Sequence, residues 1–131
     1  MGVTFNEATK ALFDGKNFPV VATINADGSV QTSVVWAKRD GDAVLFATVR
    51  GRLKERNMQR DPRVSLSVFD LEDPLKYVEI RGRAEITEEG GRELINELSH
   101  KYDGKDFRTE PPEVVRVVVR VVPDKITGYA A

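Results

Sequence analysis

Four cations stand at alternate positions in the stretch ATVRGRLKERN, residues 47–57: Arg50, Arg52, Lys54 and Arg56. Cations this close repel one another, so the stretch is either a basic surface solvated by water or the binding site of an anion. Residues 50–63 carry six cations and two anions, although the whole chain has a net charge of −1. A local excess in a nearly neutral chain favours a small anionic ligand over a polyanion.

The basic stretch is predicted to enter a helix. From Arg52 to Arg60 the chain has no Gly, Pro or β-branched residue, and Asp61-Pro62 then ends the helical pattern. Cations at a helix N-terminus are disfavoured by about 0.3–1 kcal/mol each, and a phosphate there would compensate them. Gly51 would let the backbone approach that phosphate. A solvated surface stays open as the alternative, while nucleic-acid binding lacks the interleaved aromatic residues that it needs.

Other catalytic chemistry has little support in the sequence. The chain has no cysteine, which excludes disulfides and thiolate metal sites, and one histidine leaves no metal site to predict. That histidine, His100, follows Ser99 on a predicted amphipathic helix, where a surface or hydrogen-bonded role is expected. Neither Gly-x-Gly-x-x-Gly nor a Walker-type Gly-Lys-Ser occurs. We therefore assign no catalytic residue and no metal ligand.

Three β-strands are predicted ahead of the basic stretch. β-branched residues dominate from position 18, and Asp27-Gly28 and Asp40-Gly41 are typical of tight turns between antiparallel strands. The predicted strands are residues 18–25, 30–38 and 43–48. The basic stretch therefore begins where the third strand ends. Trp36, near the end of the second strand, suits a core position and a pocket wall equally well.

Three more strands are predicted beyond the basic helix, at residues 63–70, 76–87 and 114–123. Gly82, inside the second of these, indicates a bulge or a bend. Tyr77, at its start, suits either a core or a pocket position. The last strand, VVRVVVRVVP, is rich in β-branched residues and is expected in the middle of a sheet.

Two further helices complete the predicted elements. Asn6 is expected to cap the first, and Gly15 to end it in a left-handed conformation. Thr87 is expected to cap the other, which runs to Tyr102 and precedes an exposed loop. Six strands joined mostly by antiparallel turns predict an α+β, mainly β fold, whose sheet closes into a barrel with flanking helices. The 131 residues suit a single domain, residues 1–131.

Composition sets the expected environment of the protein. The chain is 40% hydrophobic and 31% charged, which is ordinary for a globular protein, and its apolar runs are too short for a bilayer. The N-terminus lacks the charged and apolar regions of a signal peptide. We expect a cytoplasmic protein that binds neither membranes nor nucleic acid.

The sequence also resembles a known protein family. The motif RGRLKERNMQRDPRVSL followed by KYVEIRGRAEI, within a likeness that runs across nearly the whole chain, resembles the pyridoxamine 5′-phosphate oxidase-like split β-barrel superfamily. Within it, the motif resembles the flavin/deazaflavin oxidoreductases that use coenzyme F420. The resemblance implies a six-stranded split barrel and a homodimer with the cofactor in a groove between the subunits.

The resemblance also implies a set of cofactor-binding residues: Gln31, Ser33, Trp36, Thr48, Arg52, Lys54, Asn57, Lys76 and Tyr77. Arg52 and Lys54 correspond to the family's basic pair and are expected to hold the phosphate of the cofactor tail. The residues of the second and third strands are expected along the ring or the ribityl chain. Lys76 and Tyr77 are expected to reach the groove from the partner subunit.

Two departures from the family pattern bear on the activity. The chain ends PDKITGYAA, without the C-terminal Trp and Arg of enzymes that oxidise pyridoxamine phosphate. Leu53 stands before Lys54, where FMN-binding oxidases often have Arg, and this favours F420 over FMN. The expected function is transfer of a hydride from reduced F420 to an electron-poor, conjugated small-molecule acceptor. An FMN-binding oxidoreductase of the same fold, or a non-catalytic flavin- or deazaflavin-binding protein, is the alternative.

Overall fold

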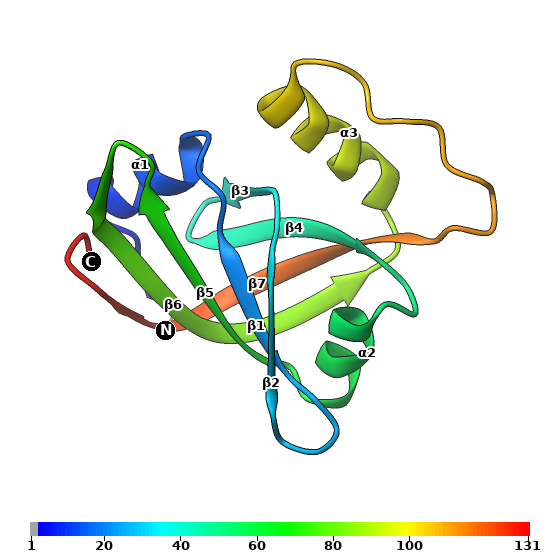
Figure 1. Cartoon of the computed structure of the whole chain (residues 1–131), viewed down its shortest axis with the longest axis horizontal. Helices are drawn as coiled ribbons and strands as arrows, with labels where there is room; N and C mark the ends of the chain where they lie inside the picture. The colour runs from blue at the N-terminus through cyan, green and yellow to red at the C-terminus, as the bar shows by residue number, and fades with distance from the viewer. Residues whose placement is uncertain (1–2) are drawn as a thin grey trace.

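The computed structural model describes residues 3–131, which form one antiparallel sheet surrounded by three helices (Figure 1). Its elements in chain order are α1 (Glu7–Asp14), β1 (Val20–Ile24), β2 (Val30–Val34), β3 (Ala37–Asp40), β4 (Ala43–Val49), α2 (Leu53–Arg60), β5 (Arg63–Asp70), β6 (Asp73–Thr87), α3 (Gly91–Asp103) and β7 (Arg116–Thr127). No helix in this part of the chain is long and apolar enough to cross a membrane.

The strands lie in the order β2-β1-β5-β6-β7-β4-β3, and every neighbouring pair is antiparallel. The sheet curls round, but its two end strands, β2 and β3, are not hydrogen-bonded to each other (Figure 1). The predicted split-barrel fold class is confirmed, but the expected closure of the sheet into a barrel is wrong, because the two end strands do not pair. As predicted, β7 lies inside the sheet, between β6 and β4.

The predicted number of strands, six, was wrong: the described residues form seven. The expected strand over residues 30–38 is divided, because the chain changes its pairing partner at Val35 and Trp36. Up to Val35, whose N–H donates to the carbonyl of Pro19 at 2.9 Å, the chain follows β1. From Ala37 it pairs with Phe46 of β4 instead. At Val35 and Trp36 the chain therefore passes from one end strand of the sheet to the other.

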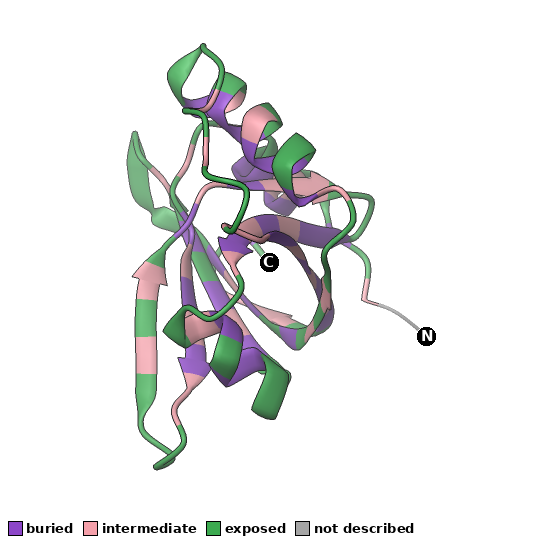
Figure 2. Ribbon diagram, turned by 90° about the vertical axis from the view of Figure 1, so that its right-hand side faces the viewer, coloured by how far each residue is buried: buried purple, intermediate pink, exposed green. Residues whose placement is uncertain are grey.

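The core lies inside the curled sheet. Inward-facing side chains of alternating strand positions meet there and are fully buried: Val21, Phe46, Leu66, Val68, Val78, Ile80, Val119 and Val121. Outward positions alternate with them, as the banding of buried and exposed residues along the strands shows (Figure 2). The bulge predicted at Gly82 is confirmed by a register shift against β7. A Cβ at this residue would lie 2.2 Å from the carbonyl oxygen of Val122, so only glycine fits.

Two predicted helix ends need correction. Asn6 caps α1 as expected, but Gly15 has φ −75° and not a left-handed conformation; Asn17 instead donates to the free carbonyl of Leu12 at 2.9 Å. Thr87 does not cap α3, because it still pairs with β7 as the last residue of β6. The cap is Gly90, at φ +85°. The strand ends at Thr87, as predicted, and the helix begins only at Gly91, after a short turn.

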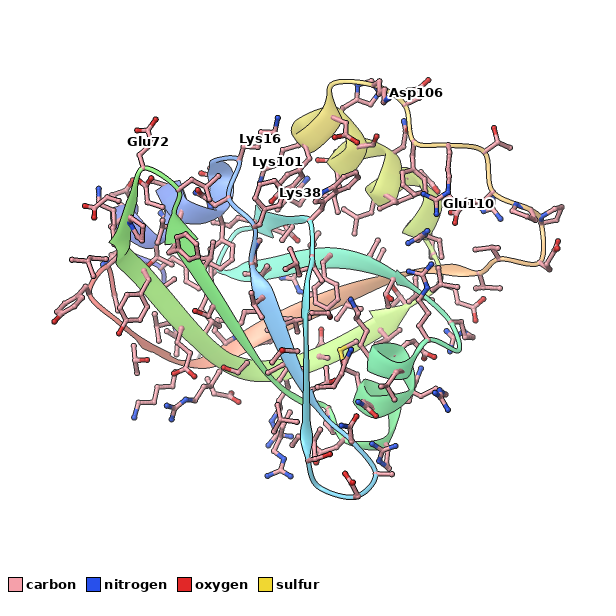
Figure 3. The ribbon with its side chains drawn as sticks, viewed as in Figure 1. Lys16, Lys38, Glu72, Lys101, Asp106 and Glu110 are labelled. Carbon is pink, nitrogen blue, oxygen red and sulfur yellow. The ribbon has the colours of Figure 1, made fainter. Side chains whose placement is uncertain are left out.

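The loop between α3 and β7 is held against both elements. Arg92 donates to the carbonyl oxygens of Pro111 and Val114 at 3.1 and 2.9 Å. Glu110 and Arg116 form an ion pair at 2.7 Å, and their side chains are only 7% and 4% exposed. Glu110 thus lies against the start of β7, whereas Asp106 lies beside the C-terminal part of α3, 2.7 Å from His100 (Figure 3). The expected loop is present, and the ion pair of Glu110 and Arg116 fixes it to β7.

Candidate active site

The turn between β4 and α2 is organised by a buried carboxylate. Glu55, 2% exposed in the third position of α2, accepts a hydrogen bond from the backbone N–H of Gly51 at 2.8 Å. Its carboxylate also forms an ion pair with the guanidinium of Arg50 at 3.4 Å. The same guanidinium forms a second ion pair with Glu88 at 3.1 Å. Arg50 is therefore neutralised by two carboxylates. The four cations of the basic stretch are thus not equivalent.

Arg52 and Lys54 have no carboxylate within 4 Å among residues 3–131, and they line one hollow of about 200 Å³. Arg52 stands at the N-cap of α2 without making a capping hydrogen bond. Burial lowers the pKa of Lys54, and the charge of Arg52 lowers it further. Both effects penalise the ammonium form, so an anion in the hollow would relieve them.

Thr48 lines the same hollow, is 2% exposed, and its hydroxyl has no hydrogen-bond partner in the described chain. The hydroxyl of Ser33 is likewise buried without a partner. Ser33 itself does not line the hollow, although the next residue of β2, Val34, does. A buried unpaired polar group costs about 1–3 kcal/mol. The hydroxyl of Thr48 and the two unpaired cations, which share the hollow, are a donor set that fits a phosphorylated ligand.

Trp36 proves to be both a core residue and a pocket wall. Its ring stacks on Tyr102 with centroids 5.4 Å apart and an interplanar angle of 5°. The ring of Phe107 meets it edge-on, with centroids 6.4 Å apart and an interplanar angle of 83°. The Tyr102 hydroxyl donates to the carbonyl of Asn17 at 2.5 Å, which fixes the stack from behind. Trp36 also lines the hollow of Arg52, so a rigid aromatic surface faces the ligand space.

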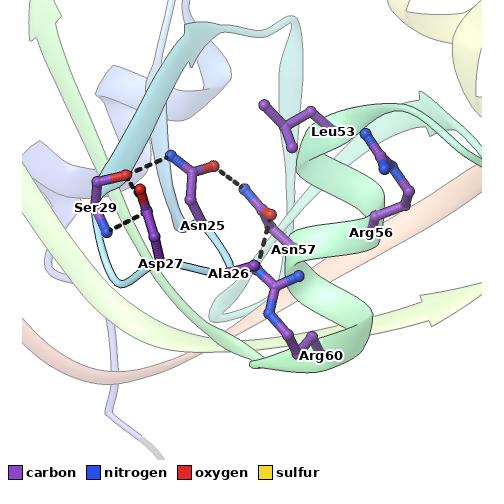
Figure 4. Close-up of a pocket in the computed structure, with 8 residues that line it drawn as sticks. All are labelled: Asn25, Ala26, Asp27, Ser29, Leu53, Arg56, Asn57 and Arg60. Atoms are coloured by element: carbon purple, nitrogen blue, oxygen red, sulfur yellow. Dashed lines mark hydrogen bonds between the residues drawn. The ribbon is translucent and has the colours of Figure 1, made fainter.

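Asn57 lies on the inner side of α2 and is 1% exposed. Its amide nitrogen donates to Thr23 at 3.1 Å and to Asn25 at 2.8 Å, and its oxygen accepts from Arg60 at 2.9 Å. It borders a second cavity, of about 450 Å³, between α2 and the β1–β2 turn (Figure 4). The polar atoms of its side chain are occupied within the protein, so Asn57 holds α2 against the sheet.

Lys76 and Tyr77 are not brought to the hollow of Arg52. Both are exposed at the start of β6, by the β5–β6 turn, at the opposite side of the molecule from α2 (Figure 1). Tyr77 is 37% exposed and meets the ring of Tyr129 edge-on at 5.9 Å. Within one chain these two residues are separate from the other seven predicted site residues.

Sequence reasoning missed the residues that support the site. Glu55 occurs three positions after the N-cap, a pattern typical of a capping box, and that signal could have identified it. Nothing local indicated that Tyr102 and Phe107 would back Trp36. Ser99 donates to the carbonyl of Lys105 at 2.7 Å, and His100 lies 2.7 Å from Asp106 on the surface. These hydrogen bonds are structural, in agreement with the expectation for His100.

Comparisons with known proteins agree with this geometry. The sequence pattern of the family described as pyridoxamine 5′-phosphate oxidase matches residues 5–130. A solved F420 reductase is 30% identical with a TM-score of 0.80, and the match covers 90% of this chain and 94% of that one. A conserved hypothetical protein from Mycobacterium tuberculosis is 27% identical with a TM-score of 0.74, over 95% of this chain and 84% of that one.

The similarity to a third solved structure supports the fold but not the function. General Stress Protein 26 from Bacillus anthracis is 23% identical with a TM-score of 0.70, and the match covers 92% of this chain and 89% of that one. The family match spans nearly the whole chain and includes every residue of the hollow. This chain belongs to the pyridoxamine 5′-phosphate oxidase-like split β-barrel family of oxidoreductases, in its flavin/deazaflavin branch.

Proposed function

We propose that the protein is a coenzyme F420-dependent reductase that passes a hydride to an electron-poor, conjugated organic acceptor. One observation carries the proposal. The unpaired cations Arg52 and Lys54 share a hollow with the buried, unpartnered hydroxyl of Thr48. The pair matches the positions of the family's phosphate-binding residues, and the similarity to an F420 reductase supports the choice of cofactor.

In this proposal Arg52 and Lys54 hold the phosphate of the cofactor tail through charge-assisted hydrogen bonds. The N–H groups at the start of α2 add donors that have no partner inside the helix. Arg56, which has no ion pair within residues 3–131, is available for the carboxylates further along the F420 tail. Arg50 is already paired with Glu55 and Glu88, so we do not assign it to the tail.

Toward the ring, Ser33 and Thr48 offer hydroxyls, Gln31 offers its amide, and Trp36 forms a wall. When bound, the deazaflavin supplies the hydride. The protein aligns the donor and the acceptor and excludes water, so no side chain has to act as a nucleophile. Asn57 contributes by fixing α2, on which the phosphate-binding residues are placed.

A second copy of the chain completes the proposed groove. The hollow of about 200 Å³ falls below the roughly 300–1,000 Å³ typical of cofactor sites, so one chain supplies only part of the walls. Val30 and Val34, both 62% exposed on the end strand β2, offer apolar surface beside it. In such a homodimer Lys76 and Tyr77 would come from the partner subunit.

FMN is the second candidate cofactor. The matching family is described as pyridoxamine 5′-phosphate oxidase, and Arg52 and Lys54 would accept the phosphate of FMN equally well. Leu53, in the place where FMN-binding relatives often have Arg, favours F420. A non-catalytic protein that binds either cofactor is the remaining alternative.

Equilibrium titration with F420 and with FMN tests the site. The double variant Arg52→Ala/Lys54→Ala should weaken cofactor binding by about 1.5–3 kcal/mol per lost charged hydrogen bond. The control Lys16→Ala/Lys125→Ala removes two exposed cations outside the hollow and should bind normally. Equal affinity of the two double variants would refute the phosphate assignment.

The same titration separates the alternatives. Tighter binding of FMN than of F420 would favour an FMN-dependent enzyme. Tight binding of F420, with no conjugated ester or enone oxidising the reduced form, would favour a non-catalytic binding protein.

A further inference from the structure

A branched hydrogen-bond network joins α2 to the β1–β2 hairpin (Figure 4). Asn57 is its centre, and three branches leave it, toward Arg60, toward Asn25 and toward Thr23. Asn57 and Thr23 are each 1% exposed, so water does not compete for their polar atoms. The direction of every hydrogen bond in such a network follows from the groups at its ends.

The first end is a cation that can only donate. Arg60 donates to Oδ1 of Asn57 at 2.9 Å and to the backbone carbonyl of Ile24 at 2.7 Å. A guanidinium has no acceptor, so the oxygen of Asn57 must face Arg60. The two amide protons of Asn57 are then directed to Asn25 and Thr23.

The second end is an anion that can only accept. Asp27 accepts the hydroxyl of Ser29 at 2.5 Å and its backbone N–H at 3.0 Å. Ser29 has thereby used its only hydroxyl proton, so its oxygen accepts from the amide nitrogen of Asn25 at 3.0 Å. The oxygen of Asn25 is left to accept from Asn57 at 2.8 Å. Both ends thus impose the same orientation on Asn57.

The third branch carries this orientation to β2. Thr23 accepts from Asn57 at 3.1 Å, so its single proton goes to the amide oxygen of Gln31 at 3.2 Å. No hydrogen bond within residues 3–131 uses the amide nitrogen of Gln31. Gln31 lies on the same side of β2 as Ser33, whose buried hydroxyl is also without a partner.

We propose that Gln31 is a preset hydrogen-bond donor, and that its –NH₂ group selects a ligand with an acceptor atom, such as a ring carbonyl, at that point of the groove. This inference rests on the proposed function, because it takes the groove to hold a flavin-like ring. The donor is fixed from a distance by Arg60 and Asp27 through Asn57. Thr23 and Asn57 are positioning residues that do not touch the ligand.

Equilibrium binding of F420 tests whether Gln31 acts as a hydrogen-bond donor to the ligand. Gln31→Met keeps the length of the side chain and removes the donor, and should weaken binding roughly 2- to 12-fold. Gln31→Glu places a charged acceptor where the ligand has an acceptor, and should weaken binding more than Gln31→Met does. If Gln31→Glu binds as tightly as the wild type or more tightly, the donor assignment is wrong.

Variants of Thr23 test whether this residue orients the amide of Gln31. Thr23→Val keeps the shape but leaves Gln31 free to turn its amide, so binding should weaken, and Thr23→Ser should restore it. Thr109→Val, on the exposed loop before β7, makes the same substitution away from the groove and should bind as the wild type does. Circular dichroism checks that each variant is folded. Equal affinity of Thr23→Val and Thr109→Val would overturn the relay.

A nuclear magnetic resonance measurement reads the same group without turnover. In ¹⁵N–¹H spectra the side-chain –NH₂ pair that disappears in Gln31→Met identifies Gln31. This pair should shift on saturation with F420 and should also shift in ligand-free Thr23→Val. An unchanged pair in either experiment counts against the inference.

The failure of this inference and that of the proposed function can be told apart. If the wild type binds neither F420 nor FMN, both fail. If the wild type binds F420 and Arg52→Ala/Lys54→Ala does not, but the Gln31 and Thr23 variants bind normally, only this inference fails.

Discussion

Glu55 accepts a hydrogen bond from the backbone N–H of Gly51 at 2.8 Å, and its side chain is only 3% exposed. The pair closes the turn that brings β4 into α2 and so places Arg52 and Lys54 beside Thr48. Gly51 has φ +96°, a left-handed conformation that favours glycine. The position of the basic pair therefore depends on a buried carboxylate that is paired within the protein.

Glu55→Ala should lower the free energy of unfolding by about 2–4 kcal/mol, because it removes a buried cap and one partner of Arg50. Urea denaturation of the ligand-free protein measures this change. Glu93→Ala is a matched control, since Glu93 is in the first turn of α3 but exposed, and it should change stability by no more than about 0.5 kcal/mol. Similar losses in the two variants would contradict the role given to Glu55.

Cofactor affinity should fall at high pH, and the fall should begin below the pH at which an ordinary lysine titrates. Burial and Arg52 lower the pKa of Lys54 from its ordinary value of 10.5 in the free protein, whereas a bound phosphate favours the ammonium form. Binding therefore takes up a proton once the pH passes the lowered pKa, and the dissociation constant then rises with pH. Titrations between pH 7 and 10 check this, and Arg52→Ala should move the onset to higher pH.

Lys54→Met should stabilise the ligand-free protein by roughly 0.5 kcal/mol or more at neutral pH, because the cost of burying the ammonium disappears. The unfolded chain binds more protons than the folded one between the lowered pKa and 10.5, so the wild type regains this stability as the pH rises through that window. The gain from Lys54→Met should therefore shrink toward pH 10.5. A gain that does not depend on pH would contradict the buried charge as its cause.

The buried ion pair of Glu110 and Arg116 should make the loop before β7 sensitive to acid. Arg116 lowers the pKa of Glu110 below its ordinary value of 4.5, so the stabilisation is complete above pH 4.5 and is lost as the pH falls through the lowered pKa. Glu110→Gln leaves Arg116 buried without a counter-charge and should cost about 3–5 kcal/mol at pH 7. Thermal denaturation should show a smaller difference between wild type and variant at pH 3 than at pH 7.

Val30→Arg should disrupt the proposed homodimer without unfolding the chain. Val30 is 62% exposed in one copy, so the new side chain costs little there, whereas a cation buried in an apolar interface is strongly unfavourable. Sedimentation analysis should show a dimer for the wild type and a monomer for the variant. Thr109→Arg adds the same charge on the exposed loop and should leave the dimer intact. A monomeric wild type would refute the homodimer.

The sequence by itself determined the local structure. Asp27-Gly28 and Asp40-Gly41 form turns because their backbone conformations require such residues, and α2 runs from Leu53 to Arg60 because its composition favours a helix and Pro62 stops it. The bulge at Gly82 was likewise legible in the sequence. These features depend on the dihedral preferences of a few neighbouring residues, and such preferences act wherever the chain folds.

Only the tertiary structure decided which polar groups are free. Arg50 and Arg52 look alike in the sequence, but Arg50 meets Glu88, in the turn after β6, and Arg52 meets no carboxylate in the described chain. Asn57 turned inward because Thr23 and Asn25 lie beside it. Charge pairing and hydrogen bonding depend on distances across the sheet, which local residue preferences do not fix, and these distances left Arg52, Lys54 and Thr48 available for a ligand.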